Sequence, residues 1–169
     1  MTAAEKTMQW VETFVVHHAL CPFAAAPVRA QKVAALEINA EDEEEAFFAA
    51  LTQVQKLLDE DRDTLETSLL VFPTNLLADF STFLDFVYTL EDALAETGAD
   101  QLVQLAHFRP NYRFDGVAED DPGNLTNRSP YPVIQLLRTE SVAAAVAAYP
   151  GVAEIPERNV DKMREVFGN

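Results

Sequence analysis

Arginine is concentrated in one polar stretch of this chain, residues 101–138. Of the 12 basic and 28 acidic residues in the sequence, this stretch holds four of each, so it is locally neutral in an otherwise acidic protein. A guanidinium group binds carboxylates and phosphates through parallel N–H donors. We therefore expect these arginines to form a site for an anionic small molecule: Arg109, Arg113, Arg128 and Arg138.

The same arginines have a structural interpretation. They could pair with Asp115, Asp120 and Asp121 and serve only to hold a long loop in place, with the prolines stiffening it. Both interpretations remain open at the level of the sequence, because ion pairs that fix loops also cluster in this way.

His107 and Cys21 are candidate catalytic residues. His107 ends an expected strand, on the face that carries Val103 and Leu105, and it could act as a general base beside Arg109. Its alternative role is that of a structural hydrogen-bonding group. Cys21 follows His17 by about one helical turn, where an imidazole could lower the pKa of the thiol, but a lone cysteine at a helix end is typically a small buried apolar residue.

Asp121 is a third candidate, beside Asp120 and close to Asn124. Together they offer oxygen ligands for a hard cation such as Mg²⁺. Acidic pairs before Pro-Gly are equally typical of turns, and the spacing matches no calcium-binding loop. We therefore assign no metal here, and the sequence leaves any cofactor unknown.

These candidates must be positioned by an alternating series of helices and strands. Such alternation predicts the α/β class, as a small α+β sandwich in which a mainly four-stranded mixed sheet is covered by about five helices. The long polar loop then joins the last two strands. We expect helices over 2–20, 41–58, 79–97, 141–149 and 156–167, and strands over 33–38, 68–72, 101–108 and 132–137.

Length and composition restrict the class of protein. The 169 residues suit one globular domain, and a formal charge of −16 argues against binding to nucleic acid or to an anionic membrane. Because the chain has one cysteine, no secretory start and no apolar stretch of about 18 residues, we expect a cytoplasmic protein outside the membrane. Its oligomeric state is left unassigned.

Several short motifs are distributed over nearly the whole chain: Trp10, Leu20-Cys21-Pro22-Phe23, Leu70-Val71-Phe72-Pro73, Phe108 with Pro110, Tyr112 and Phe114, Asp120-Asp121, and Thr126-Asn127-Arg128-Ser129-Pro130-Tyr131-Pro132. Together they resemble a bacterial family catalogued as domain of unknown function 1415. The chain departs from the family pattern at Arg109 and Gln135, where the family has histidine, and at Leu125, where it has tyrosine. The resemblance implies no activity, but the shared residues become candidates for a common role, and it adds Arg29, Asn127 and Ser129 to the candidate ligand-binding residues.

Three functional hypotheses follow. The first is a small cytosolic enzyme or binding protein for an anionic metabolite held by the arginine-rich loop. The second is a noncatalytic interaction or regulatory module that docks a protein partner through the acidic surface 41–45 or through the loop. The third is thiol chemistry at Cys21.

Overall fold

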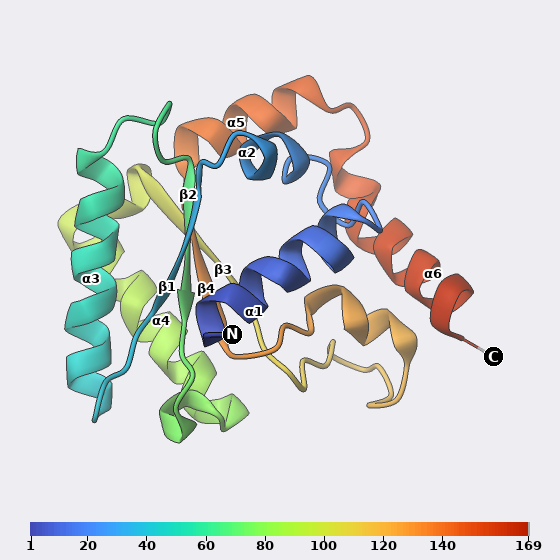
Figure 1. The fold of residues 1–169 in the computed structure, drawn as a ribbon, viewed down its shortest axis with the longest axis horizontal. Coiled ribbons are helices and arrows are strands. Elements are labelled where there is room, and N and C mark those ends of the chain that lie inside the picture. Colours follow the sequence, from blue (N-terminus) through green and yellow to red (C-terminus); the bar gives the residue numbers. More distant parts are fainter. Residues whose placement is uncertain (169) are drawn as a thin grey trace.

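A four-stranded mixed sheet forms the centre of the computed structural model, which describes residues 1–168 (Figure 1). The strand order is β1-β2-β4-β3, in which β1 and β2 are parallel and β4 is antiparallel to both of its neighbours. The expected α+β fold with a small mixed sheet is thus confirmed. The strands are β1 (Val33–Glu37), β2 (Thr67–Val71), β3 (Val103–Phe108) and β4 (Val133–Arg138).

Strand β2 is buried on both faces, as its uninterrupted apolar sequence predicts. Leu70 packs on one side of the sheet, while Leu69 and Val71 pack on the other. Because β2 lies between β1 and β4, both of its backbone edges are also paired. It is therefore an interior strand, like β4, and both layers of helices pack against it.

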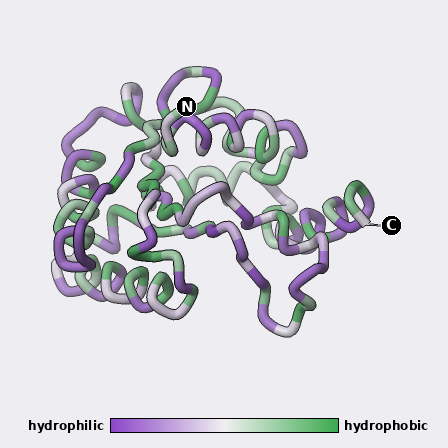
Figure 2. Tube along the Cα trace, turned by 60° about the horizontal axis from the view of Figure 1, so that its bottom comes forward, coloured by the Kyte–Doolittle hydropathy of each residue, from purple (hydrophilic) through white to green (hydrophobic). Residues whose placement is uncertain are grey.

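Helices α3 (Glu43–Asp59) and α4 (Phe80–Thr97) cover one face of the sheet. Aspartates begin both helices, since the carboxylate of Asp42 accepts from the Glu45 N–H and that of Asp79 accepts from the Thr82 N–H. Gly98 ends α4 with a φ of 77°, the left-handed cap expected of glycine. Figure 2 shows hydrophilic and hydrophobic residues alternating along the helices, as amphipathic packing requires.

The opposite face is covered by α1 (Ala3–Trp10), by the wider π-helical turns of Val11–Val16 and by α2 (Ala25–Arg29). Thr2 and Glu5 form the expected capping box. The predicted C-terminal end of the first helix, residue 20, was wrong. The helical turns end at Val16, and Ala19 adopts a φ of 52°. No helix was predicted between residue 20 and β1, but α2 forms there, since alanine favours helix and Pro27 is tolerated in a first turn.

Two helices follow β4: α5 (Thr139–Ala148) and α6 (Ile155–Phe167). In Figure 1, α6 lies apart from the sheet, beside the loop that joins β3 to β4. It packs on a 3₁₀ turn of that loop, Pro122–Asn127, and buries Met163 completely. Within the part of the chain that the structure describes, no helix is both long and apolar enough to cross a membrane.

Candidate functional site

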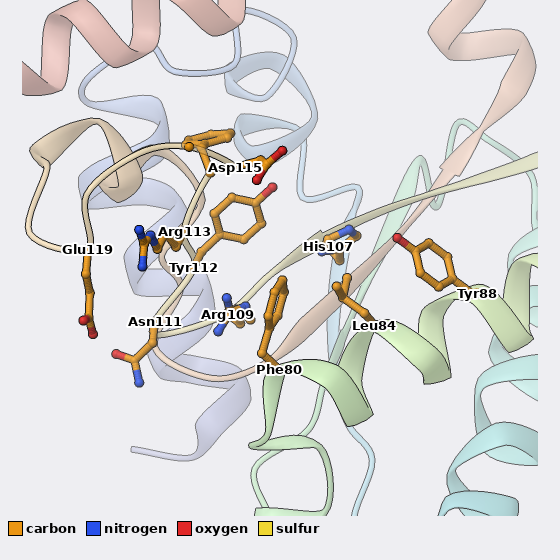
Figure 3. Close-up of a pocket in the computed structure, with 12 residues that line it drawn as sticks. Phe80, Leu84, Tyr88, His107, Arg109, Asn111, Tyr112, Arg113, Asp115 and Glu119 are labelled. Atoms are coloured by element: carbon orange, nitrogen blue, oxygen red, sulfur yellow. The ribbon is translucent and has the colours of Figure 1, made fainter.

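A hollow lies between the first half of α4 and the segment that follows β3 (Figure 3). Its volume is about 740 Å³. Helix α4 contributes an aromatic and aliphatic wall, and the end of β3 and the start of the loop contribute polar and aromatic side chains. The residues that the two sides supply are Phe80, Leu84 and Tyr88 from α4, and His107, Arg109, residues 111–116 and Glu119 from the other side.

Arg109 lies on the wall of this pocket with an unusual environment for a guanidinium. The residue is only 8% exposed, and its guanidinium carbon lies 3.5 Å from the centre of the Phe80 ring. Its Nε is buried, and among residues 1–168 it has no hydrogen-bond acceptor. Burial lowers the pKa of Arg109, and the positive charge of Arg128 acts in the same direction, whereas Tyr112 and Asp79 oppose it.

The backbone explains why Arg109 is held inward. It follows the last residue of β3 directly, and its N–H donates to the Asn127 carbonyl at 3.2 Å, which joins the start of the loop to the end of its 3₁₀ turn. Its own carbonyl accepts from the Tyr112 N–H at 3.2 Å. The side chain is therefore fixed by a turn at the end of an ordered strand.

His107 lies in the same pocket, two residues before Arg109. It shares a face of β3 with Val103 and Leu105, as the alternation of the strand predicts, and its ring lies 5.7 Å from the ring of Phe83. Its Nδ1 is buried, again without a hydrogen-bond partner in the described chain. Burial, followed by the charge of Arg109, lowers the pKa of His107 from 6.5, so the imidazole is neutral at pH 7.

Charged groups of both signs line the outer part of the pocket. Arg113 is exposed and donates from its Nε to the Val117 carbonyl. Asp115 and Glu119 are exposed acids of the same lining. Between them and Arg109 lies Tyr112, whose phenol has a pKa raised by burial, so it stays protonated and can donate a hydrogen bond at neutral pH.

Arg128 holds the loop together instead of facing a carboxylate. Its Nε donates to the Tyr112 carbonyl at 2.9 Å, and its Nη2 donates to the Glu119 carbonyl at 2.7 Å. Asn124, which is completely buried, accepts from the Phe114 N–H and donates to the Ala118 carbonyl. The structural interpretation expected the loop arginines to pair with loop acids. Within residues 1–168 they form no such ion pair, and Arg128 instead binds backbone carbonyls.

Asp121 is used at the contact between the loop and α6. Its carboxylate accepts from the Gly123 N–H at 2.8 Å and from Arg164 at 3.0 and 2.9 Å. The hydrogen bonds from Arg164, and then that from Gly123, lower the pKa of Asp121. In the described part of the chain, no three histidine, cysteine or acidic side chains converge to hold a metal ion.

Asn127 and Ser129 also form bonds within the loop. The amide oxygen of Asn127 accepts from the Thr126 hydroxyl at 3.0 Å. The buried Ser129 hydroxyl donates to the Tyr131 carbonyl. Neither residue lines the pocket.

Three predicted site residues lie elsewhere. Arg138, at the far end of β4, donates to the carbonyls of Leu57, Glu60 and Leu65. Arg29 is exposed at the end of α2. Cys21 is an exposed residue, yet the backbone around its sulfur removes enough water to raise the pKa of the thiol, and the N–H groups of Phe23 and Ala24 only partly oppose this.

The pocket therefore unites His107, Arg109 and Arg113 out of the predicted set. It also contains an α4 wall that was not among the predicted site residues. Phe80 is 38% exposed and Leu84 is half-buried, because the edge of the apolar stripe of α4 faces the hollow. The spacing of four that continues from them to Tyr88 is the signal that marked this wall.

The comparisons with known proteins assign a family. The model of a family described as a protein of unknown function, DUF1415, matches residues 2–168. No curated protein and no solved structure shows a significant match to the chain.

Proposed function

The chain belongs to the DUF1415 family, which is a family of unknown function, and we propose that this member is a small enzyme or binding protein whose pocket receives an anionic metabolite on Arg109. One observation carries the proposal: Arg109, a residue only 8% exposed, lines a hollow of about 740 Å³, and its buried Nε lacks an acceptor in the described chain. Native proteins leave few buried donors unpaired.

The energetic argument concerns the cost of that burial. Removing water from a guanidinium that has no carboxylate hydrogen-bonded to it is unfavourable, and stacking on Phe80 offsets only part of this cost. A bound carboxylate or phosphate would supply charge-assisted hydrogen bonds, each worth roughly 1.5–3 kcal/mol. A bound anion would therefore supply the hydrogen-bond acceptors that Arg109 lacks in the folded chain.

His107 supports the catalytic form of the proposal. A neutral imidazole can accept a proton, and this one lies in the same pocket as Arg109. With the anionic group of the ligand held on Arg109, the imidazole would be available as a general base for a hydroxyl or a carbon acid of that ligand. Asp121, which is bonded to Arg164, and Cys21, whose thiol pKa is raised, gain no such support.

The interaction module is the weaker alternative. Two of its acidic residues have a local explanation, because Asp42 caps α3 and the Glu45 carboxylate accepts from the Glu41 N–H. The setting we propose is the bacterial cytoplasm, where a lone thiol stays reduced and where a charge of −16 disfavours nucleic acid as a partner.

A thermal-shift and calorimetric screen of carboxylated and phosphorylated metabolites tests the proposal. At 100 times its Kd, a ligand stabilises the fold by about 2.7 kcal/mol. Arg109→Met should abolish this gain, whereas Arg62→Met, which removes an exposed guanidinium elsewhere, should retain it. A panel without any hit, or a ligand that Arg109→Met still binds, would contradict the proposal.

A further inference from the structure

We propose that the ligand of this pocket is a singly charged carboxylate attached directly to a flat aromatic ring. The inference rests on the anion site proposed above and narrows it to one chemical class. Three independent features of the pocket support it: an aromatic lining, a stacked guanidinium and a balance of charges that favours one negative charge.

Aromatic side chains form both sides of the hollow. On α4, Phe80 and Tyr88 are 38% and 55% exposed, and Leu84 lies between them at a spacing of four residues. The other side of the lining includes Tyr112 and Phe114, whose rings lie 5.0 Å apart in an edge-to-face arrangement. A flat ring bound between these sides would cover aromatic surface that now contacts water.

The position of Arg109 defines the orientation of the carboxylate. A separation of 3.5 Å between the guanidinium carbon and the Phe80 ring centre is the thickness of van der Waals contact. It leaves no room for an N–H to point into the ring, so the guanidinium lies flat on Phe80. Its donors, including the unpartnered Nε, then point sideways within that plane.

A carboxylate that accepts two parallel hydrogen bonds from a guanidinium lies in the same plane. If the carboxylate is attached directly to an aromatic ring, conjugation keeps the ring in this plane too. The ring therefore extends from Arg109 as a flat continuation of the stacked layer. A saturated ring or a branched chain does not share the plane of its carboxylate and cannot form such a flat continuation.

The charges around the pocket favour a single negative charge. Arg109 is the buried cation of the lining, and it is opposed nearer the mouth by Asp115 and Glu119, with Arg113 exposed beside them. Arg128, whose charge reaches Arg109, donates to two backbone carbonyls. A dianion such as a phosphate monoester would bring a second negative charge to a lining in which Arg113 alone offsets the two exposed carboxylates.

The test compares simple probes by calorimetry at pH 8: benzoate, acetate, cyclohexanecarboxylate, phenyl phosphate and benzamide. We expect benzoate to bind about tenfold more tightly than acetate or cyclohexanecarboxylate. Phenyl phosphate, which is a dianion at this pH, and uncharged benzamide should both bind more weakly than benzoate. Arg109→Met should abolish the binding of every anion.

Variants of the aromatic wall provide the second part of the test. Tyr88→Ala should weaken benzoate binding about threefold to tenfold and leave acetate binding unchanged, whereas Tyr88→Phe should retain the affinity for benzoate. Phe48→Ala is the matched control, because Phe48 is 57% exposed on α3 and lies outside the pocket. Circular dichroism would confirm that the variants fold.

The outcomes separate the two proposals. If acetate, phosphate and benzoate bind equally well and all require Arg109, the anion site stands and the aromatic class is wrong. If Tyr88→Ala weakens acetate as much as benzoate, the wall does not contact a ring and the inference is also wrong. If no anion binds in an Arg109-dependent manner, both proposals fail.

Discussion

Two arginines of the polar stretch illustrate opposite uses of a guanidinium group. Arg138 is surrounded by carbonyl oxygens at the C-terminal end of α3 and in the segment before β2. These carbonyls would otherwise lack donors, because the last turn of a helix leaves its carbonyls unpaired. Arg109 has aromatic neighbours in place of such acceptors. The acceptors around Arg138 mark it as a structural arginine, whereas their absence around the Nε of Arg109 motivates the proposal that Arg109 binds a ligand.

Replacing Arg138 tests this distinction through stability. Arg138→Met should lower the free energy of unfolding by about 2–3 kcal/mol, because hydrogen bonds from a charged donor to half-buried carbonyls are lost. Urea unfolding measures the change. Arg62→Met, which removes only exposed ion pairs, should cost less than about 1 kcal/mol. Benzoate affinity should be the same in both variants, and a loss of affinity in Arg138→Met would place that residue at the site after all.

His107 should make stability depend on pH. Burial lowers its folded-state pKa below 6.5, so between that lower pKa and about 6.5 the unfolded chain binds a proton that the folded chain does not. Its contribution is therefore complete above pH 6.5 and is lost as the pH falls. His107→Phe should lose less stability than the parent between pH 7 and pH 5, as measured by urea unfolding. Both proteins retain His18, whose pKa is also lowered, and equal slopes would refute the assignment.

At the scale of elements, α6 fastens the pocket loop to the N-terminal segment. Asn159 and Lys162 of α6 donate to the carbonyls of Leu20 and His18, at 2.6 and 2.7 Å. On the loop side, Arg164 binds Asp121, and Gly123 leaves room for Val160. One helix therefore links the start of the chain to the 3₁₀ turn behind the pocket wall.

The approach at Gly123 predicts a sensitive substitution. A Cβ at this position would lie 2.8 Å from Val160 Cγ1, closer than real contacts allow. Gly123→Ala should therefore destabilise the protein by about 1–3 kcal/mol. In the double variant with Val160→Ala, part of this loss should return, and a double-mutant cycle in urea would measure the coupling. Strictly additive effects would show that the two residues do not touch.

The sequence predicted this framework better than it predicted the site. Asp79 and Gly98 marked the ends of α4, and the apolar run after Thr67 marked the interior strand, because caps and periodicity act locally. Grouping the arginines by their nearness in sequence was less informative. Arg138 and Arg109 lie near opposite ends of the β3–β4 pair. This separation depends on the antiparallel register of the two strands, which no local sequence pattern predicts.

At the scale of the whole molecule, the excess of acidic residues is a source of repulsion. The formal charge is −16, and the exposed Glu91 and Glu96 lie in the C-terminal half of α4, where the helix dipole is also negative. Such repulsion acts over about 30 Å in 0.01 M salt and over only about 3 Å in 1 M salt.

Salt should therefore stabilise this protein. We expect the Tm to rise between 10 mM and 0.5 M NaCl, by about 2–4 °C for each kcal/mol of repulsion that is screened. Calorimetry would measure the rise. The variant Glu91→Gln, Glu96→Gln should begin at a higher Tm in low salt and respond less to added salt. A falling Tm in the parent would mean that attractive ion pairs dominate.

The β3–β4 hairpin does not require the long loop that joins its two strands. Phe108 and Val133 are directly paired at the open end of two antiparallel strands, a place where a turn of two residues would suffice to reverse the chain. Residues 109–132 are thus an insertion that the sheet itself does not require. The proposed pocket draws Arg109, Arg113 and Glu119 from this insertion, whereas α4 and β3 supply other parts of its lining, so substitutions within the insertion can alter the polar side of the pocket without altering the strand order.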